Sequence, residues 1–316
     1  MKVRVHKKTL EAIDIQTFEL VPIDGSELPP FTAGAHVEVQ IADQLSRQYS
    51  LCNSPIEAKC YVLGVLRDPA TRGGSAAMHD RVLEGDTLEI SAPKNNFALV
   101  SGAHKSLLFA GGIGVTPLLS MAEQLASQGA PFEMHYCARS RDRAAFVSRI
   151  AKAPFAAQVH FHYDDQDQAQ RLDLSAGLGT VDETTHIYVC GPAGFIDWVL
   201  SGARQQGWPD VQLHVEYFSA VLLDAIKDEP FEVKIASTGD VYSIPVGKTI
   251  LDVLAADGYD IATSCGEGVC GTCLTGVLEG EPDHRDFYLS ADSQAQNNMM
   301  LPCCSRAKSK LLVLDL

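Results

Sequence analysis

The first hundred residues alternate between apolar and polar positions in short runs that are separated by turns. Runs of this kind predict β-strands with one buried face. Turn residues stand at Asp24-Gly25, Gly73-Gly74 and Glu84-Gly85-Asp86. No long amphipathic helix is predicted between the runs, so we expect residues 1–102 to form an antiparallel β-barrel. The predicted strands include Val3–His6, His36–Ile41, Tyr49–Leu51, Tyr61–Arg67 and Thr87–Ser91.

From about residue 104 the pattern changes, because helical segments now lie between most of the short apolar runs. Ser106–Ala110 is followed by a glycine-rich turn and by a helical stretch from Pro117 to Gln128. This alternation predicts a doubly wound parallel sheet with helices on both faces over residues 103–222. The later strands are predicted at Phe132–Cys137, Val159–Tyr163, His186–Cys190 and Gln212–Phe218.

The last part of the chain carries a third pattern. Within Val221–Pro230, residues 223–230 are expected to be a linker. Residues 231–316 are expected to form a separate small α+β domain. Its predicted elements are a hairpin of Phe231–Ile235 and Asp240–Pro245, a helix over Thr249–Asp257 that Gly258 ends, and a strand over Leu311–Leu316.

Length and composition exclude several classes of protein. A chain of 316 residues is too long for one ordinary domain and predicts two or three. No run approaches the roughly 18 apolar residues of a membrane span. Met1–Lys8 leads into no apolar signal core, so a cytoplasmic location is expected. The net charge of −15 argues against a nucleic-acid partner; it keeps the protein in solution or steers docking onto a basic redox partner.

The nine cysteines are unevenly distributed, and in a reducing compartment they are not expected to form disulfides. Cys265-x4-Cys270-x2-Cys273, with Cys303 after a further 29 residues, is the plant-type 2Fe–2S pattern. Glycines within this run let the backbone bend around a cluster and point N–H groups at the sulfurs. A zinc site is the alternative, although zinc usually takes two close pairs of ligands. Cys304 adjoins Cys303 and is the alternative fourth ligand.

Two further motifs follow predicted strands of the parallel sheet. Gly111–Pro117 (GGIGVTP) opens a helix whose amino terminus can accept a pyrophosphate, although Pro117 replaces the third glycine of the dinucleotide fingerprint. Cys190–Gly194 (CGPAG) repeats this geometry after a later strand, and two such turns define a crevice. Taken alone, Cys190 would be a small buried hydrophobic residue.

A third motif, Arg47-Gln48-Tyr49-Ser50-Leu51, lies on a predicted barrel strand. An arginine suits a phosphate, a tyrosine ring can cover a planar cofactor, and a serine hydroxyl can bond to a ring nitrogen. Gly73-Gly74-Ser75 offers backbone donors to the same phosphate. Without the other motifs, a surface arginine beside a core tyrosine would explain this run equally well.

In this order, R-x-Y-S, G-G-S, G-G-I-G-V-T-P, C-G-P and the plant-type cysteines resemble the ferredoxin-reductase superfamily with a carboxyl-terminal ferredoxin domain. Within it, the chain resembles the phthalate dioxygenase reductase family and especially the reductase components of vanillate O-demethylases, over essentially all 316 residues. The resemblance implies an FMN-binding barrel at 1–102, an NAD-binding α/β domain at 103–222 and a β-grasp ferredoxin domain at 231–316.

The resemblance also implies site residues. Ser50 would bond near flavin N5 and Cys190 would lie beside the nicotinamide, with no general acid or base. The SRAK run at Ser305–Lys308 aligns Cys303, and not Cys304, with the fourth ligand. The implied FMN set is Arg47, Gln48, Tyr49, Ser50, Leu66, Arg67, Gly73, Gly74 and Ser75, with Phe218 near the flavin. The implied nicotinamide set is Gly112, Gly114, Val115, Thr116, Pro117, Cys190, Gly191 and Pro192, and the cluster ligands are Cys265, Cys270, Cys273 and Cys303.

The implied activity is electron transfer. NADH would give a hydride to FMN, and the 2Fe–2S cluster would pass single electrons to a Rieske non-haem iron oxygenase that acts on an aromatic acid or ether. The alternatives are a quaternary-amine oxygenase, a cytochrome or a separate ferredoxin as acceptor, or a redox sensor. Arg139, Arg141 and Arg143 leave NADPH open, although the family favours NADH. His284-Arg285-Asp286 is predicted to be a surface turn that is solvated or faces a partner.

Overall fold

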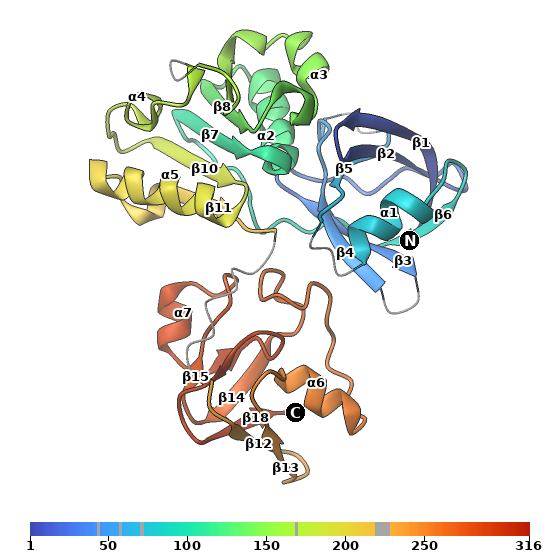
Figure 1. Ribbon diagram of the computed structural model, residues 1–316, viewed down its shortest axis with the longest axis vertical. Coiled ribbons are helices and arrows are strands. Elements are labelled where there is room, and N and C mark those ends of the chain that lie inside the picture. The colour runs from blue at the N-terminus through green and yellow to red at the C-terminus, as the bar shows by residue number, and fades with distance from the viewer. Residues whose placement is uncertain (43–44, 57–58, 70–72, 168–169, 219–227) are drawn as a thin grey trace. The chain divides into compact units, whose positions relative to one another are not determined.

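The computed structural model describes residues 1–42, 45–56, 59–69, 73–167, 170–218 and 228–316 (Figure 1). The chain divides into two compact units, Met1–Glu216 and Tyr217–Leu316, and each is described by itself. The predicted boundary between residues 222 and 223 and most of the predicted linker lie outside the described residues. No helix among the described residues is long and apolar enough to cross a membrane.

The amino-terminal half of the first unit is the predicted antiparallel barrel. Six strands pair in the order β4-β3-β6-β1-β2-β5, and every pairing is antiparallel. Leu51, just after β4, forms a bridge with Leu63 of β5, and this bridge joins the two end strands of the sheet. Alternate residues such as Val3, Val5 and Val37 are buried inside. The strands are β1 (Lys2–Ala12), β2 (Ile15–Pro22), β3 (His36–Ala42), β4 (Leu45–Ser50), β5 (Tyr61–Leu66) and β6 (Thr87–Ile90).

The barrel region also contains a short helix that the sequence did not predict, α1 (Gly74–Arg81). The sequence predicts a turn and backbone phosphate donors at Gly73-Gly74, but no helix. Gly73 does turn the chain, with φ of 94°, and the helix begins at the next residue. Lys8 Nζ donates to the carbonyl oxygens of His79 and Val82, both at 2.7 Å, and so satisfies the carboxyl end of the helix.

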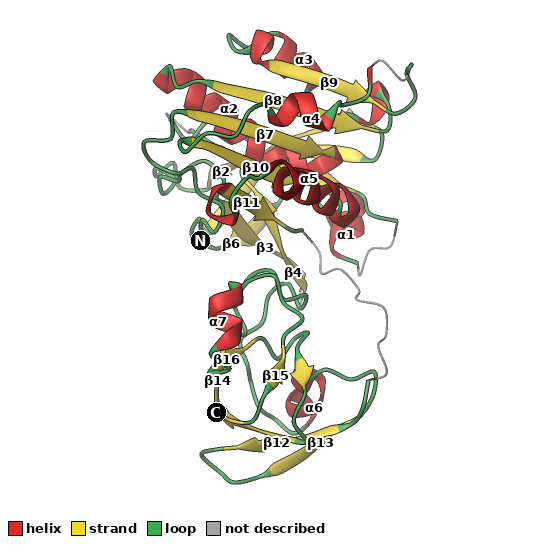
Figure 2. Ribbon diagram, turned by 90° about the vertical axis from the view of Figure 1, so that its left-hand side faces the viewer, coloured by secondary structure: helices red, strands yellow, loops and turns green. Residues whose placement is uncertain are grey.

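The rest of the first unit is the predicted doubly wound sheet. Five parallel strands lie in the order β11-β10-β7-β8-β9, with α2 and α5 on opposite faces (Figure 2). The chain leaves β7 toward β8 and leaves β10 toward β11, so the winding reverses between β7 and β10. Ligands of such sheets bind at this switch point. The elements are β7 (Lys105–Gly111), α2 (Val115–Gln128), β8 (Phe132–Ala138), α3 (Val147–Ala151), β9 (Val159–Tyr163), α4 (Leu174–Leu178), β10 (Thr185–Cys190), α5 (Ala193–Gln206) and β11 (Leu213–Glu216).

The barrel and the parallel sheet share one hydrophobic core within this unit. Ile15, Ala33 and Phe97 of the barrel region belong to the same buried cluster as Leu118 of α2 and Tyr188 of β10. The packing is close, because a methyl group on Gly64 of β5 would lie 2.8 Å from the Thr116 methyl group. The glycine-rich turn before α2 is thereby held against the barrel.

The second unit has the predicted β-grasp architecture. Its mixed sheet has the order β13-β12-β18-β14-β16, in which β12 and β18 are parallel, and Ile250 and Leu254 of α6 pack on it. Thr249 caps α6 in a capping box with Asp252, so the predicted helix is correct to within one residue at each end. The elements are β12 (Phe231–Ile235), β13 (Val241–Ile244), α6 (Ile250–Ala256), β14 (Thr275–Glu279), β15 (Pro282–Asp283), α7 (Ala291–Ala295), β16 (Met299–Met300), β17 (Arg306–Ala307) and β18 (Leu311–Asp315), with β15 and β17 paired in a small second sheet.

Candidate cofactor and iron–sulfur site

The predicted flavin residues of the first unit gather around the amino end of α1. β4 carries the Arg47–Ser50 run, and a methyl group on Gly74 would collide with the Arg47 side chain. Ser75 Oγ accepts a hydrogen bond of 3.2 Å from the backbone N–H of Asp68, just beyond Leu66 and Arg67 at the end of β5. An arginine over a helix amino terminus is the donor set that a phosphate requires.

Tyr49 supports the assignment of a planar polar ligand to this place. Its hydroxyl is buried and has no hydrogen-bond partner among the described residues. Burial also raises the pKa of the hydroxyl above its ordinary value, so it stays protonated and able to donate. A buried hydroxyl without a partner is costly, and a bound polar group would satisfy it. The residues present therefore fit a flavin phosphate and ring.

The two glycine turns lie side by side where the sheet changes direction. β7 and β10 are neighbours, with Ala110 opposite Cys190. A methyl group on Gly114 would collide with the Cys190 carbonyl oxygen, and one on Gly191 would lie 2.9 Å from Gly111 Cα. The glycines thus allow two backbone turns to touch at the carboxyl ends of adjacent strands, which is the arrangement that the sequence predicted.

The residues that follow Gly114 differ in what they can offer a ligand. The side chains of Val115, Thr116 and Pro117 are buried in the core of the unit. The Thr116 hydroxyl already donates to the Ile113 carbonyl oxygen at 3.0 Å. These three residues therefore shape the start of α2 and leave the backbone of the turn as the surface that a dinucleotide can contact.

Glu216 is a site residue that the sequence reasoning missed. Ser50 Oγ donates to Glu216 Oε2 at 3.3 Å, and Glu216 is the register neighbour of Cys190. Burial raises the pKa of Glu216 to about 8, and burial followed by the nearby Glu216 raises the pKa of the Cys190 thiol well above its ordinary value. Near neutral pH both groups are mainly protonated. The available signal was the position of Glu216 near the end of the last predicted parallel strand, Gln212–Phe218.

In the second unit, the four predicted cluster ligands converge. The loop of residues 265–273, called the cluster loop below, bends at glycines with positive φ (66° at Gly266, 72° at Gly268 and 74° at Gly271). Backbone N–H groups of Glu267 and Thr272 donate to the sulfurs of Cys265 and Cys270 at 3.3 and 3.4 Å. These donors follow the glycines directly, as expected for a loop that wraps a negatively charged cluster.

The thiols also contact one another across the site. Hydrogen bonds from Cys270 and Cys303 lower the pKa of Cys265, and contact with Cys265 and Cys273 raises that of Cys303. Thiols that lie this close together can lose their protons and bind a soft metal centre as thiolates. No three His, Cys, Asp or Glu side chains of the described residues are arranged to hold a single metal ion.

Cys304 lies behind the cluster loop. A methyl group on Gly268 would collide with the Cys304 sulfur, which lies 3.8 Å from the Leu301 carbonyl oxygen. Cys303 is buried, whereas Cys304 is half-buried. The identity of the fourth ligand stays a prediction.

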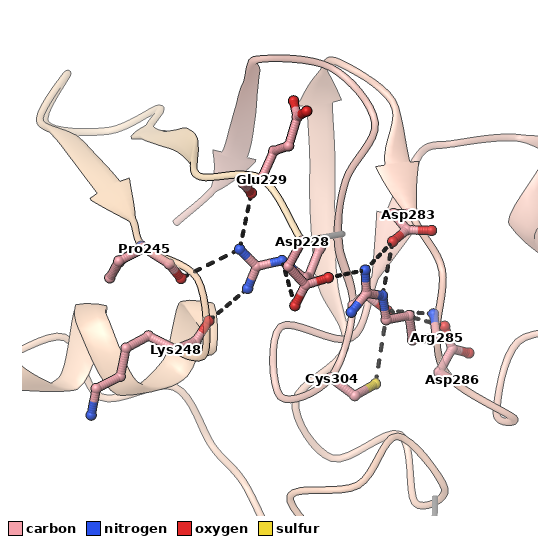
Figure 3. Close-up of polar contacts among 10 residues, drawn as sticks. Asp228, Glu229, Pro245, Lys248, Asp283, Arg285, Asp286 and Cys304 are labelled. Carbon is pink, nitrogen blue, oxygen red and sulfur yellow. Dashed lines mark hydrogen bonds and ion pairs between the residues drawn. The ribbon is translucent and has the colours of Figure 1, made fainter. Parts of the chain in front are cut away.

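The interpretation of His284-Arg285-Asp286 as a solvated turn is wrong. The side chains of His284 and Asp286 are 8% and 0% exposed, and that of Arg285 is 25% exposed. Asp286 accepts hydrogen bonds from the Leu289 backbone and from Ser305, and Arg285 is enclosed by Asp228 and Asp283 (Figure 3). A run of three polar residues predicts exposure, but here the charges of Arg285 and Asp286 have partners inside the unit. The two ring nitrogens of His284 are buried and have no hydrogen-bond partner among the described residues.

Phe218 lies at the start of the second unit and is 39% exposed. The adjacent Tyr217 ring stacks on Phe287, with 4.2 Å between the ring centroids. The predicted position of Phe218 beside the flavin stays a prediction.

Comparisons with known proteins agree with this arrangement. The 2Fe–2S iron–sulfur cluster binding domain family matches residues 233–308, a range that includes all four predicted ligands. The match favours a 2Fe–2S cluster over the zinc alternative. The amino-terminal domain family of dimethylamine monooxygenase subunit DmmA-like proteins matches residues 91–213.

Relatives match the chain along its whole length. A vanillate O-demethylase oxidoreductase of Pseudomonas sp. (strain HR199 / DSM 7063) is 50% identical over 100% of both chains. A carnitine monooxygenase reductase subunit of Escherichia coli (strain K12) is 41% identical over 96% of this chain and 94% of its own. The solved phthalate dioxygenase reductase, described as a modular structure for electron transfer from pyridine nucleotides to [2Fe–2S], is 37% identical and superposes with a TM-score of 0.78 over 100% of this chain and 98% of its own. The chain therefore belongs to the phthalate dioxygenase reductase-like family of electron-transfer oxidoreductases with a carboxyl-terminal 2Fe–2S domain.

Proposed function

We propose that this protein takes a hydride from NADH onto FMN and passes the electrons singly through a 2Fe–2S cluster to an oxygenase. The observation that carries the proposal is the convergence of Ser50, Cys190 and Glu216 at the switch point of the sheet, in the same chain as the four-cysteine site. The proposed domains are residues 1–102 for FMN, 103–222 for the nicotinamide and 231–316 for the cluster.

The residues of the barrel hold the flavin in this proposal. Arg47 and the backbone donors of Gly73, Gly74 and Ser75 bind the phosphate, and Tyr49 and Ser50 face the ring system. Gln48, Leu66 and Arg67 line the same strand ends. When bound, FMN supplies two-electron chemistry toward the nicotinamide and one-electron chemistry toward the cluster.

The residues at the switch point position the nicotinamide. The backbone of Gly112 and Gly114 approaches the pyrophosphate, and Cys190, Gly191 and Pro192 form the opposite wall. Glu216, protonated near neutral pH, bonds to Ser50 and leaves no buried negative charge where the hydride is transferred. The chain contributes alignment, and no proton transfer is required of it. We propose NADH as the donor, since Arg143 is already paired with Asp14 at 3.0 Å.

The proposed acceptor is a Rieske non-haem iron oxygenase that acts on an aromatic acid or ether. The similarity to a vanillate O-demethylase oxidoreductase over the full length supports this class. A second candidate, an oxygenase of quaternary amines, is supported by the similarity to the carnitine monooxygenase reductase subunit. The proposed location is the cytoplasm, a compartment in which thiols stay reduced.

The first test is the anaerobic visible spectrum of the purified protein, with the released flavin identified by chromatography. We expect FMN and an iron–sulfur absorbance that bleaches when NADH is added. A protein that stays colourless after reconstitution with flavin, iron and sulfide would contradict the proposal. Oxygenases of the two candidate classes, supplied separately, then identify the acceptor by NADH-dependent product formation.

A further inference from the structure

Asp228 connects two arginines of the second unit. Its Oδ1 accepts a hydrogen bond of 2.8 Å from Arg285 Nη2 (Figure 3). Its Oδ2 lies 3.6 Å from Arg306 Nε. The side chains of Asp228 and Arg306 are only 17% and 7% exposed. The sequence places Asp228 in the predicted linker, yet its carboxylate is bound inside the ferredoxin fold.

Arg306 depends on this carboxylate. Its guanidinium donates to the carbonyl oxygens of Lys248, Glu229 and Pro245 at 2.8, 3.2 and 3.3 Å. Among the described residues, Asp228 is the only acidic side chain that pairs with it. Backbone carbonyls satisfy the donors but do not neutralise the charge, so removal of Asp228 would leave a buried cation without a counter-ion.

Arg285 extends the network to the turn that carries Cys303. Its side chain also pairs with Asp283 at 2.7 Å, and its backbone N–H donates to Ser305 Oγ at 3.2 Å. Ser305 is two residues beyond Cys303, and Arg306 follows it. Both arginines bonded by Asp228 are therefore attached to the segment that presents the fourth predicted ligand.

Asp286 connects the same segment to the cluster loop. Ser305 Oγ donates to its fully buried carboxylate at 3.4 Å. The next residue, Phe287, donates its backbone N–H to the Gly268 carbonyl oxygen at 3.0 Å. A methyl group on Gly268 would lie 3.0 Å from Asp286 Cα, so this segment packs directly on the cluster loop. The contacts form a continuous series from Asp228 to both parts of the cysteine site.

We propose that Asp228 is a positioning residue for the iron–sulfur cluster, because it holds Arg285 and Arg306 together and so fixes the Cys303 turn against the cluster loop. The inference rests on the proposed function, since it requires the cysteines to be cluster ligands. Without the carboxylate, two partly buried guanidinium groups would repel each other at the base of this turn. The predicted ligands would then meet the cluster in a less constrained geometry.

The test uses the complete, cluster-loaded protein with Asp228→Asn, which keeps the shape of the side chain and removes its charge. The matched control is Glu281→Gln, whose carboxylate pairs with Lys308 at 3.0 Å while both side chains are more than half exposed. Exposed ion pairs of this kind contribute little to the stability of the folded protein. The two measurements are the anaerobic rate of iron release to a chelator and the electron paramagnetic resonance spectrum of the reduced cluster.

We expect Asp228→Asn to release iron faster by about fivefold or more and to change the spectrum. Asp228→Glu should recover most of the wild-type behaviour, and Glu281→Gln should match the wild type. If Asp228→Asn does not fold, Arg285→Lys takes its place. This variant keeps the charge but loses the planar guanidinium group that reaches both Asp228 and Asp283, so the same faster release of iron is expected. A change in either measurement supports the inference.

Wild-type iron release together with a wild-type spectrum in Asp228→Asn, or in Arg285→Lys where that variant replaces it, would overturn the inference and leave the proposed function intact. A wild-type protein that holds no 2Fe–2S cluster would instead contradict the proposed function itself. The two failures are therefore distinguishable.

Discussion

Ser50 Oγ lies 3.3 Å from Glu216 Oε2, although 166 residues separate the two in the sequence. The contact joins β4 of the barrel to β11, the last strand of the parallel sheet. Glu216 is also the register neighbour of Cys190 on β10. The two residues that were predicted to take part in hydride transfer thus have the same carboxyl group as a neighbour, and the chemistry of that group becomes testable.

Glu216 should make the protein less stable as the pH rises. Burial raises its pKa to about 8, whereas a glutamate in an unfolded chain titrates near 4.3. Between these values the folded state keeps a proton that the unfolded state has released, so raising the pH favours unfolding. Above about pH 8 the loss of unfolding free energy that Glu216 causes no longer changes with pH. Glu216→Gln should remove this dependence, which amounts to at most about 1.4 kcal/mol per pH unit.

The measurement is thermal unfolding of wild type and Glu216→Gln from pH 5 to pH 9. The difference between the two curves should grow in favour of the variant up to about pH 8. Other titrating groups act on both proteins alike and cancel in the difference. Glu281→Gln, which alters an exposed carboxylate, should follow the wild type. Parallel curves for wild type and Glu216→Gln would show that Glu216 is ionised in the folded protein.

Gly114→Ala should slow reduction by NADH. The φ of Gly114 is −60°, which alanine adopts readily, so the obstacle to the substitution is the collision with the backbone of Cys190 and Gly191. Relief of that collision requires the two glycine turns to separate, at a cost of about 1–3 kcal/mol. We expect the rate constant for flavin reduction in stopped flow to fall by about tenfold or more, since misplaced reactants lose rate steeply.

Gly194→Ala is the matched control for this prediction. Gly194 belongs to the second turn motif, and a methyl group there would meet no atom within 4 Å. It should leave the flavin, the iron and the reduction rate near their wild-type values. A Gly114→Ala protein that is reduced as fast as this control would contradict the proposed role of the touching turns.

The strands and long helices were predictable because their signal is local. The predicted helix Pro117–Gln128 and the predicted strand Phe132–Cys137 match α2 and β8 to within two residues at each end. The helix α1 was missed because it buries only Gly74, Ala77 and Met78, too few positions to produce an apolar period. A glycine pair at its start then favoured a turn.

The parts of the site that were missed depend on contacts between distant segments. Glu216 meets Cys190 only because β11 pairs with β10, and the sequence does not state the order of strands in a sheet. Asp286 is buried only because Ser305 and the Leu289 backbone bond to it. The cluster ligands, in contrast, could be predicted with little knowledge of the fold, because the cluster itself requires short spacings between cysteines in one loop.

Arg47→Ala should weaken the retention of FMN and leave the iron in place. Loss of one charge-assisted contact to a phosphate costs about 1.5–3 kcal/mol, so the dissociation constant should rise by about tenfold or more. Fluorescence of the released flavin gives this constant, and iron analysis gives the cluster content. Arg204→Ala removes an exposed arginine that pairs with Asp210 at 2.8 Å and should behave as wild type. Loss of iron with normal flavin binding would assign Arg47 to another role.

Cys303→Ser and Cys304→Ser test the choice between two adjacent thiols. Cys303 is buried and exchanges hydrogen bonds with Cys265 and Cys273, whereas the Cys304 sulfur packs behind Gly268. A serine oxygen is a poor substitute for a thiolate on iron. Cys303→Ser should therefore abolish or strongly alter the 2Fe–2S absorption and electron paramagnetic resonance spectra, and Cys304→Ser should leave both nearly intact. The reverse pattern would make Cys304 the fourth ligand and would move the cluster toward the Gly268 side of the loop.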